Sequence, residues 1–528
     1  MKRILAATIT GVLLLMSMAC NNNSDNSNHS TSPSGNPVGT QAAASEKKEQ
    51  KTITFATITG YYSDGLNEAA AAYEKLHPET VVKIEIINDN ATYKTNFNAK
   101  MAAGGDNAPD IVHTNLLGGS SAELIKKSWL VKLNDFVNQP NPYNGDKTVF
   151  DGINSQYHKY AFSAEGDIAS LPFDLVGTGF FYNKDIFDKL ELQEPKTWEE
   201  LLDTSKKLQE NGYIPLAMSY AAGNLNWMKH AFIDWSSRSL YPEMLVLPGD
   251  ARYDENIHSK NKEIKYDPNN TDFDYGAIFD PEKQVLAWKD KKYDNAGPAE
   301  RKWWLLLKEL AQYYQPGFST MNDQDVYQMF ISQKAAMFWS GSWQVGAILT
   351  DQKKLGDQSF KWGTFKFPGF STPDPLFPGE PRGILTPGHT LSITMKADQE
   401  QIARAKDFLM YLYSPEVAQK VYMTTLDAGQ YVQGPSLVEG VALPDEVMSY
   451  LNGFKVAGNM QYALKDASEG NSGLNPDIKT KNMANELKFY DNKITIDQFL
   501  DEKSKIASGY MEKYVQDNGY DLDPRTNP

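Results

Sequence analysis

Hydrophobic and polar residues alternate from about residue 51 onward in a way that predicts strands and helices in turn. Ile53 and Phe55 alternate with polar neighbours over 52–57, which indicates a strand. Apolar residues over 66–76 then recur at helical spacing, and Pro78 ends that helix. A second alternation follows over 82–86. Strand, helix and strand in this order predict βαβ units and a mostly parallel sheet.

A second α/β region begins near residue 171. Thr197 and Glu200 form a capping-box pattern that opens a helix within it. Residues 241–300 differ, because they are rich in Asp, Asn, Lys, Tyr and Pro and show weak periodicity, and we interpret them as a surface insertion. Three short apolar runs predict strands of this second region, at 180–183, 214–218 and 335–339.

The N-terminus has the pattern of a secretory signal. Lys2 and Arg3 precede an apolar run over 4–16, and small residues follow up to Cys20. Cys20 is the only cysteine, so no disulfide can form within one molecule. Its position resembles a bacterial lipobox, which predicts lipidation at Cys20; an ordinary signal with a chance cysteine is the alternative. Residues 21–50 have almost no apolar content and predict a disordered tether.

Composition and missing motifs narrow the function. The formal net charge is −15 and the pI about 5.1, which argues against a nucleic-acid partner. The sequence has no serine-hydrolase elbow, phosphate loop or zinc-protease helix motif, and its seven histidines are scattered. Residues 267–274 faintly resemble a calcium loop but lack its central Gly and terminal Glu, so we expect no metal and no cofactor. After the signal no stretch is long and apolar enough to span a membrane, so the lipid is the expected attachment.

Four stretches, in this order, resemble the family 1 extracellular solute-binding proteins. They are Ala69–Glu85, Ala108–Val112, Gly179–Leu208 and Lys334–Ile348. The resemblance implies an α/β fold of two lobes (the type II periplasmic-binding-protein arrangement), with the ligand in a cleft between them. It implies lobe 1 at 51–170 plus 366–412, and lobe 2 at 171–365 plus 413–528.

The same resemblance implies a function. The chain would be a monomeric substrate-binding lipoprotein of an ABC-type importer, not an enzyme. It would be anchored on the extracellular face of the cell membrane, as in Gram-positive bacteria. It would capture a carbohydrate, an oligosaccharide above all, by hinge closure and deliver it to the transmembrane subunits of the importer.

Candidate ligand residues follow strands or lie where the chain is expected to cross between lobes. Strand ends and clefts between domains are where open α/β folds bind ligands. Sugars pack their apolar faces on aromatic rings and hydrogen-bond through their hydroxyls. The resemblance implies that a Trp at position 343 stacks on the ligand. The candidates are Tyr61, Tyr62, Asp64, His113, Asn115, Asp174, Tyr220, Asn224, Trp227, Trp343, Arg382 and His389.

Several of these residues have a purely structural alternative. Asp64 is equally placed to cap a helix. Trp227 lies in a helix, where aromatic residues are usually core, and His113 and His389 fit as buried structural histidines. Two other functions also stay open. One is a surface sugar sensor or adhesin. The other is a secreted glycoside hydrolase or lyase, because the pair of catalytic carboxylates that a hydrolase needs is defined by its position in space and leaves no sequence pattern.

Overall fold

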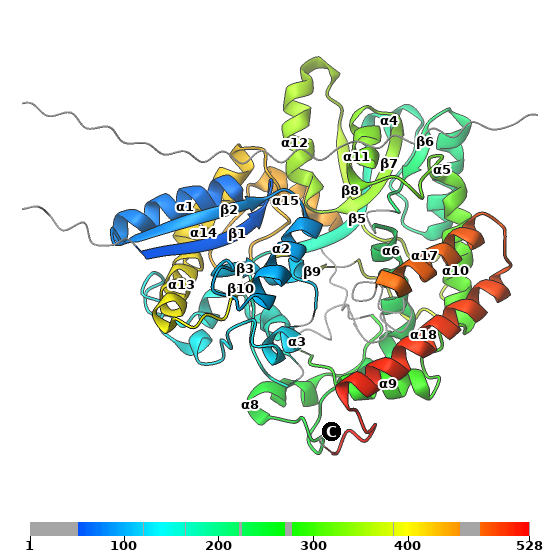
Figure 1. The fold of residues 1–528 in the computed structure, drawn as a ribbon. Coiled ribbons are helices and arrows are strands. Elements are labelled where there is room, and N and C mark those ends of the chain that lie inside the picture. Colours follow the sequence, from blue (N-terminus) through cyan, green and yellow to red (C-terminus); the bar gives the residue numbers. More distant parts are fainter. Residues whose placement is uncertain are drawn as a thin grey trace, which may run out of the picture. The chain divides into compact units, whose positions relative to one another are not determined.

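The computed structural model describes residues 51–119, 121–163, 165–220, 224–269, 277–383, 385–454 and 476–526. The signal, Cys20 and the tether lie outside these ranges, as does most of the calcium-like stretch. The elements described below all belong to one unit, residues 49–528 (Figure 1). Among the described helices, none is both long enough and apolar enough to cross a membrane.

The first sheet has five strands in the order β2-β1-β3-β10-β4. Strand β1 pairs in parallel with β2, in a register that runs from Lys51 opposite Thr80 to Ile58 opposite Ile87, and also pairs in parallel with β3. Strand β10 runs antiparallel to both of its neighbours. The strands are β1 (Lys51–Ile58), β2 (Thr80–Ile87), β3 (Ile111–His113), β4 (Leu171–Pro172) and β10 (Thr390–Ile393).

Helices cover this sheet because their apolar stripes face it. Ile53 and Phe55 of β1 are fully buried against α1 and α13, as the alternation predicted. Helix α14 begins at Pro415 and packs on α1, where Lys420 and Thr424 both contact Glu68. The helices are α1 (Ser63–Leu76), α2 (Asn90–Ala102), α3 (Ser121–Lys126), α13 (Gln399–Leu412) and α14 (Pro415–Asp427).

The second sheet has the order β6-β7-β5-β8, and β9 pairs with the start of β5. Only β6 and β7 pair in parallel; β5 is antiparallel to β7, β8 and β9. The capping box formed by Thr197 and Glu200 is present at the start of α5. The strands are β5 (Leu175–Asn183), β6 (Ile214–Ala217), β7 (Ala335–Gly341), β8 (Trp362–Phe365) and β9 (Leu385–Pro387), and helices beside them include α4 (Lys184–Lys189), α5 (Trp198–Glu210), α6 (Asn224–Ser237), α10 (Pro298–Leu310), α11 (Asp323–Ile331) and α12 (Gln344–Leu355).

The α/β architecture with two sheets is therefore confirmed, but the expectation of mostly parallel sheets is wrong in detail. Strands are parallel where helices connect neighbouring strands of one sheet, as between β1 and β2. Strand β5 follows β4 directly, and β10 follows β9, so each enters its sheet from the other sheet. No crossover helix fixes their direction, and both sheets are mixed.

Residues 241–300 are more than a surface insertion. They contain α7 (Tyr241–Met244), α8 (Glu255–His258) and α9 (Pro281–Lys289), and Met244 is fully buried. Helix α9 packs through Val285 on α18, one of the C-terminal helices. Arg252, in the same segment, donates to Glu165 on the side of the first sheet. The C-terminal helices are α15 (Asp445–Leu451), α17 (Pro476–Tyr490) and α18 (Ile496–Asn518). The lobe boundaries stay a prediction, with α14 lying beside the first sheet.

Candidate functional site

The segments that connect the two sheets meet around one buried carboxylate. Asp174, between β4 and β5, is fully buried. It accepts hydrogen bonds from the Tyr62 hydroxyl at 2.7 Å, the His389 backbone N–H at 2.6 Å and the His389 ring Nδ1 at 2.7 Å. A Cβ on Gly388 would lie 2.7 Å from Asp174 Oδ1 and 2.8 Å from Gln433 Oε1, so a larger residue there would displace these side chains. Through these hydrogen bonds, Asp174 holds together the β4–β5 connection, the β9–β10 connection and the segment that follows β1.

Three rings surround His389, beside Asp174. The His389 ring lies 5.0 Å from the Tyr61 ring, 5.4 Å from that of Tyr62 and 4.7 Å from that of His113. His113 Nε2 is 3.2 Å from the Thr57 hydroxyl. Burial, aided by the nearby His389, holds the pKa of His113 well below its usual value. His113 is thus a neutral ring in this cluster, while Tyr61 is partly exposed.

A second cluster forms around Asp323, the first residue of α11. Its Oδ1 accepts from Asn224 Nδ2 at 2.6 Å and from the Ser340 hydroxyl at 3.2 Å. Its Oδ2 accepts from Trp343 Nε1 and from Gln344 Nε2, both at 3.2 Å. The donors come from the starts of α6 and α12 and from the end of β7. One carboxylate thereby joins three elements of the second sheet.

The two candidate tryptophans lie beside this carboxylate. The Trp343 ring occupies the space where a Cβ on Gly341 would be, so residue 341 has to be glycine. The Trp227 ring stands edge-on to it, with centroids 6.4 Å apart and planes at 63°. Both indoles are partly exposed. The backbone of Gly341 on one side and Asp323 at the indole N–H fix the ring of Trp343, which stays partly exposed.

The two clusters are close enough to interact. Burial raises the pKa of Tyr61, and the charges of Asp323 and Asp174 raise it further. Burial also raises the pKa of Tyr431, again helped by Asp323, and the Tyr61 and Tyr431 rings lie 5.6 Å apart. Ser342, next to Trp343, exchanges hydrogen bonds with the backbone of Gly177 in β5. Aromatic rings from both sheets and two carboxylates therefore share one region.

Arg382 lies apart from both clusters, whereas Asp64 and Asn115 lie beside the first one, hydrogen-bonded to Gln430 and to the Thr390 N–H; the ligand contacts of all three stay predictions. Arg382 is fully buried and binds Asp234 through Nε at 3.0 Å and Nη2 at 2.5 Å. Asp234 lies ten residues after Asn224 on α6, roughly 15 Å along the helix. Asp64 and Asn115 are both exposed.

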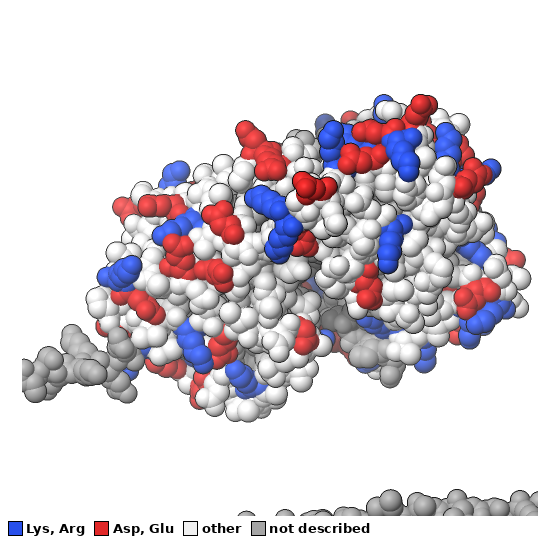
Figure 2. Space-filling view, turned by 90° about the horizontal axis from the view of Figure 1, so that it is seen from above, with Lys and Arg blue, Asp and Glu red and all other residues white. Residues whose placement is uncertain are grey.

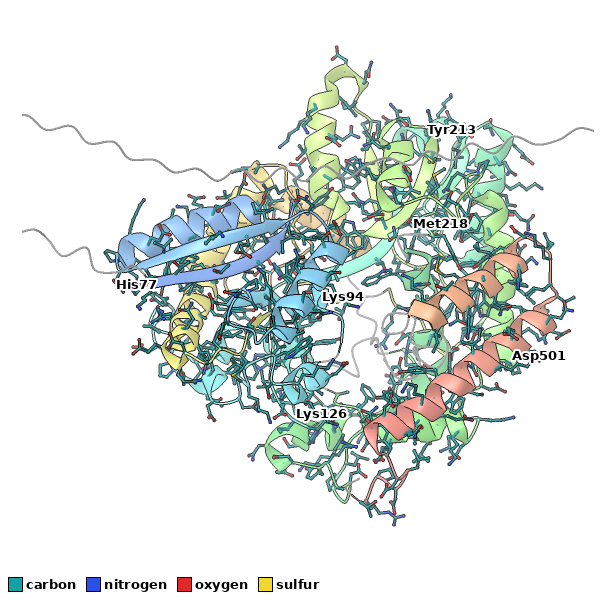
Figure 3. All side chains as sticks on the ribbon, viewed as in Figure 1. His77, Lys94, Lys126, Tyr213, Met218 and Asp501 are labelled. Carbon is teal, nitrogen blue, oxygen red and sulfur yellow. The ribbon has the colours of Figure 1, made fainter. Side chains whose placement is uncertain are left out.

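Tyr220 contacts the C-terminal helices. It follows Met218, which marks the carboxyl end of β6 in Figure 3. Its hydroxyl donates to Glu486 Oε2 on α17 at 2.9 Å. Its ring stands edge-on to Phe318 at 6.0 Å. This buried tyrosine thus ties β6 to the C-terminal helices.

Sequence reasoning missed Asp323, Tyr431 and Gln433. Asp323 directly follows Asn322, the N-cap of α11, and the sequence there shows only a helix start. Tyr431 and Gln433 lie in an irregular segment between α14 and α15. The Gln433 amide nitrogen is 3.2 Å from His389 Nε2. No sequence pattern marks these three, because their partners lie about 20 to 370 residues away along the chain.

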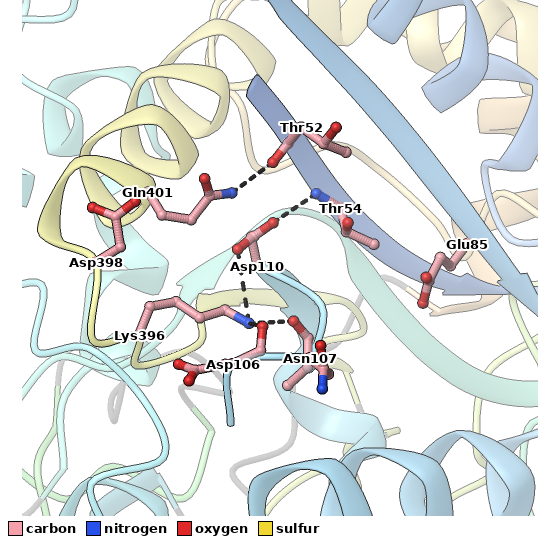
Figure 4. Close-up of a pocket in the computed structure, with 10 residues that line it drawn as sticks. Thr52, Thr54, Glu85, Asp106, Asn107, Asp110, Lys396, Asp398 and Gln401 are labelled. Atoms are coloured by element: carbon pink, nitrogen blue, oxygen red, sulfur yellow. Dashed lines mark hydrogen bonds and ion pairs between the residues drawn. The ribbon is translucent and has the colours of Figure 1, made fainter. Parts of the chain in front are cut away.

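A pocket of about 440 Å³ lies at the other end of β1, away from these clusters (Figure 4). Lys396 is buried beside it and donates to the backbone carbonyls of Gly105, Asp106 and Ala108. Asp110 accepts from the Thr54 N–H at 2.7 Å. Burial shifts the pKa of Lys396 down and that of Asp110 up. These groups satisfy one another and hold the loop after α2 against the sheet. Within the described residues, no group of three or more His, Cys, Asp or Glu side chains could hold a metal ion.

Comparisons with known proteins identify the family of the chain. The family described as "Bacterial extracellular solute-binding protein" matches residues 59–419. The chain belongs to this family. The solute-binding protein is 21% identical over 385 residues to the "Multiple sugar-binding protein" of Streptococcus mutans, covering 72% of this chain and 76% of the relative. A shorter match, 30% identical over 181 residues, is to the "sn-glycerol-3-phosphate-binding periplasmic protein UgpB" of Pectobacterium atrosepticum, covering 33% of this chain and 37% of the relative.

Solved structures confirm the fold expected of a solute-binding protein. The structure described as "SBP RafE in complex with raffinose" has a TM-score of 0.58 at 18% identity, covering 87% of this chain and 99% of that one. The "Chitin oligosaccharide binding protein" has a TM-score of 0.58 at 17% identity, covering 88% and 100%. At these identities the likeness establishes the fold. The family consists of binding proteins and is extracellular.

Proposed function

We propose that this solute-binding protein captures an oligosaccharide and delivers it to the transmembrane subunits of an ABC-type importer. The observation that carries the proposal is the partly exposed pair Trp227 and Trp343, held beside the Asp323 carboxylate. Indole faces pack on the apolar C–H faces of sugars, and other polar side chains can hydrogen-bond to the sugar hydroxyls. Tyr61 and Tyr431 would add further rings on the side of the first sheet.

Relatives support a carbohydrate in particular. The Streptococcus mutans relative is named for multiple sugars, and the two structures are named for raffinose and chitin oligosaccharides. The match to the sn-glycerol-3-phosphate-binding relative spans only about a third of each chain. The match to the sugar-binding relative spans about three quarters, so a sugar is the better supported ligand.

The protein would act at the extracellular face of the membrane as a lipid-anchored monomer. The apolar run over 4–16 that ends at Cys20 supports lipidation, and the polar residues 21–50 would serve as the tether. Two acyl chains would give stable attachment without a membrane-spanning helix. On the face shown in Figure 2, acidic and basic side chains are interspersed rather than gathered by sign, which does not favour a nucleic-acid partner.

Binding without turnover distinguishes this function from a glycoside hydrolase. Asp174 and Asp323 lie beside the aromatic rings, and each already accepts hydrogen bonds from several protein groups. A general acid or a nucleophile needs a carboxylate that can reach the glycosidic bond. We therefore propose that the protein releases its ligand unchanged.

Thermal unfolding of the purified full chain tests the proposal. A sugar present at 100 times its Kd adds about 2.7 kcal/mol to the free energy of unfolding, which raises Tm by several degrees. The panel should contain mono- and oligosaccharides together with amino acids, peptides and metal ions. A shift with an oligosaccharide, and recovery of that sugar intact, supports binding and transport. Shifts with amino acids or peptides alone would reject the carbohydrate assignment, and hydrolysis of the sugar would reject the binding role.

A further inference from the structure

The charge balance around Asp323 is unusual for a partly exposed carboxylate. All four of its hydrogen-bond donors are neutral: an amide from Asn224, a hydroxyl from Ser340, an indole from Trp343 and an amide from Gln344. A carboxylate offers about four lone-pair positions, so these donors fill its capacity. Asp323 can therefore act on a ligand through its charge and through Trp343, without a hydrogen bond of its own.

No lysine or arginine offsets this charge in the part of the chain that the structure describes. Neither Asp323 nor Asp174 forms an ion pair with a lysine or arginine there, and the partner of Asp174 is the ring of His389. The buried Arg382 is held by Asp234. The region between the two sets of rings thus has negative carboxylates on both sides. Their field extends to the rings, because Asp323 raises the pKa of both Tyr61 and Tyr431.

We propose that Asp323 is the specificity-determining residue of this site. It orients the Trp343 indole for stacking and gives the site a negative charge that admits uncharged oligosaccharides and rejects uronic-acid and phosphorylated sugars. The inference rests on the proposed function, because it assumes that the tryptophan pair is the sugar platform.

Two physical effects underlie the selection. A ligand carboxylate or phosphate placed on the indoles would leave water and meet a like charge with no lysine or arginine to compensate it. A neutral sugar pays no such penalty and finds a platform whose geometry is already fixed. The charge of Asp323 is therefore a repulsive element of the site that discriminates against anionic ligands.

Binding measurements with two classes of probe test the inference. The neutral probes are raffinose and maltotriose, and the anionic probes are trigalacturonate and sn-glycerol 3-phosphate. Isothermal titration calorimetry of the full chain should give a Kd for a neutral probe at least tenfold lower than for either anion. A tenfold rise in ionic strength should narrow this gap, because salt screens the repulsion between charges.

The variant Asp323→Asn removes the charge at nearly constant size. It should reduce the ratio of anionic to neutral Kd at least tenfold and displace the Trp343 indole N–H signal in an NMR spectrum. The matched control Asp357→Asn makes the same change at an exposed aspartate after α12 and should alter neither. A ratio that stays constant in Asp323→Asn would overturn the inference and leave Asp323 a structural residue.

The outcomes for the wild-type protein separate this inference from the proposed function. Equal or tighter binding of an anionic sugar would overturn the charge selection while the carbohydrate function stands. Absence of binding to every sugar, neutral or anionic, would overturn the proposed function and this inference with it. The wild-type comparison and its salt dependence decide the question even if Asp323→Asn does not fold.

Discussion

Trp343 is the residue whose removal should weaken ligand binding most. The change Trp343→Ala deletes a partly exposed indole that the Gly341 backbone and Asp323 hold in one orientation. Tryptophans of this kind, fixed in place and covered on binding, typically cost 2 kcal/mol or more when truncated. At about 1.4 kcal/mol per tenfold change, Kd should rise at least roughly 30-fold.

A second variant separates the ring from its hydrogen bond. Trp343→Phe keeps an aromatic face but loses the indole N–H that Asp323 accepts at 3.2 Å. A net loss of about 1 kcal/mol corresponds to a roughly fivefold rise in Kd. The assay is isothermal titration calorimetry with the sugar that gives the largest thermal shift. Trp129→Ala, at another partly exposed tryptophan beside the first sheet, serves as the control. Binding by Trp343→Ala within twofold of wild type, or equal weakening in Trp129→Ala, would refute the reasoning.

Three further changes should affect stability. Asp174→Ala leaves three buried donors without an acceptor. Urea denaturation should show a free energy of unfolding that is lower by about 3 kcal/mol or more. A loss below about 1 kcal/mol would contradict the role of Asp174 in holding the connecting segments together. Arg382→Lys breaks a bidentate buried ion pair with Asp234 and should lower the free energy of unfolding by about 3 kcal/mol in the same assay. An unchanged urea midpoint would mean that the ion pair does not stabilise the fold. His113 is neutral in the folded protein because its pKa is lowered, so only the unfolded chain takes up its proton near the usual pKa. The contribution of His113 to the free energy of unfolding is therefore complete above about pH 6.5 and is lost as the pH falls below that value. His113→Gln should flatten that part of the pH profile of Tm, and an equally steep profile would assign the pH dependence to other groups.

Local sequence patterns predicted the elements well. The alternation at Ile53 and Phe55 became a buried strand, and the capping box at Thr197 and Glu200 is present at the helix it was expected to open. Both signals depend only on neighbours within a few residues. Strand direction could not be read in this way. It depends on which strand lies next to which, and β5 and β10 enter their sheets from the other sheet.

The candidate site was predictable only in part. Tyr62 was chosen because it follows a strand, and Asp174 and His389 because they lie where the chain was expected to cross between lobes; the structure joins the three by hydrogen bonds, and their contact with a ligand stays a prediction. Local sequence patterns could not indicate Asp323, because its hydrogen-bond partners are distant in sequence: Asn224 is 99 residues away and Trp343 is 20 residues away. Polar residues at a helix start usually serve as caps, so the local pattern around Asp323 indicates only a helix start.

The antiparallel pairing of β10 with β3 fixes the order in which this protein can fold. The hydroxyls of Thr114 and Ser392, beside that pairing, are hydrogen-bonded although they lie 278 residues apart in sequence. Closing a chain segment of that length costs about 5 kcal/mol in entropy beyond a constant term. The N-terminal strands therefore cannot complete their own sheet until most of the chain is available.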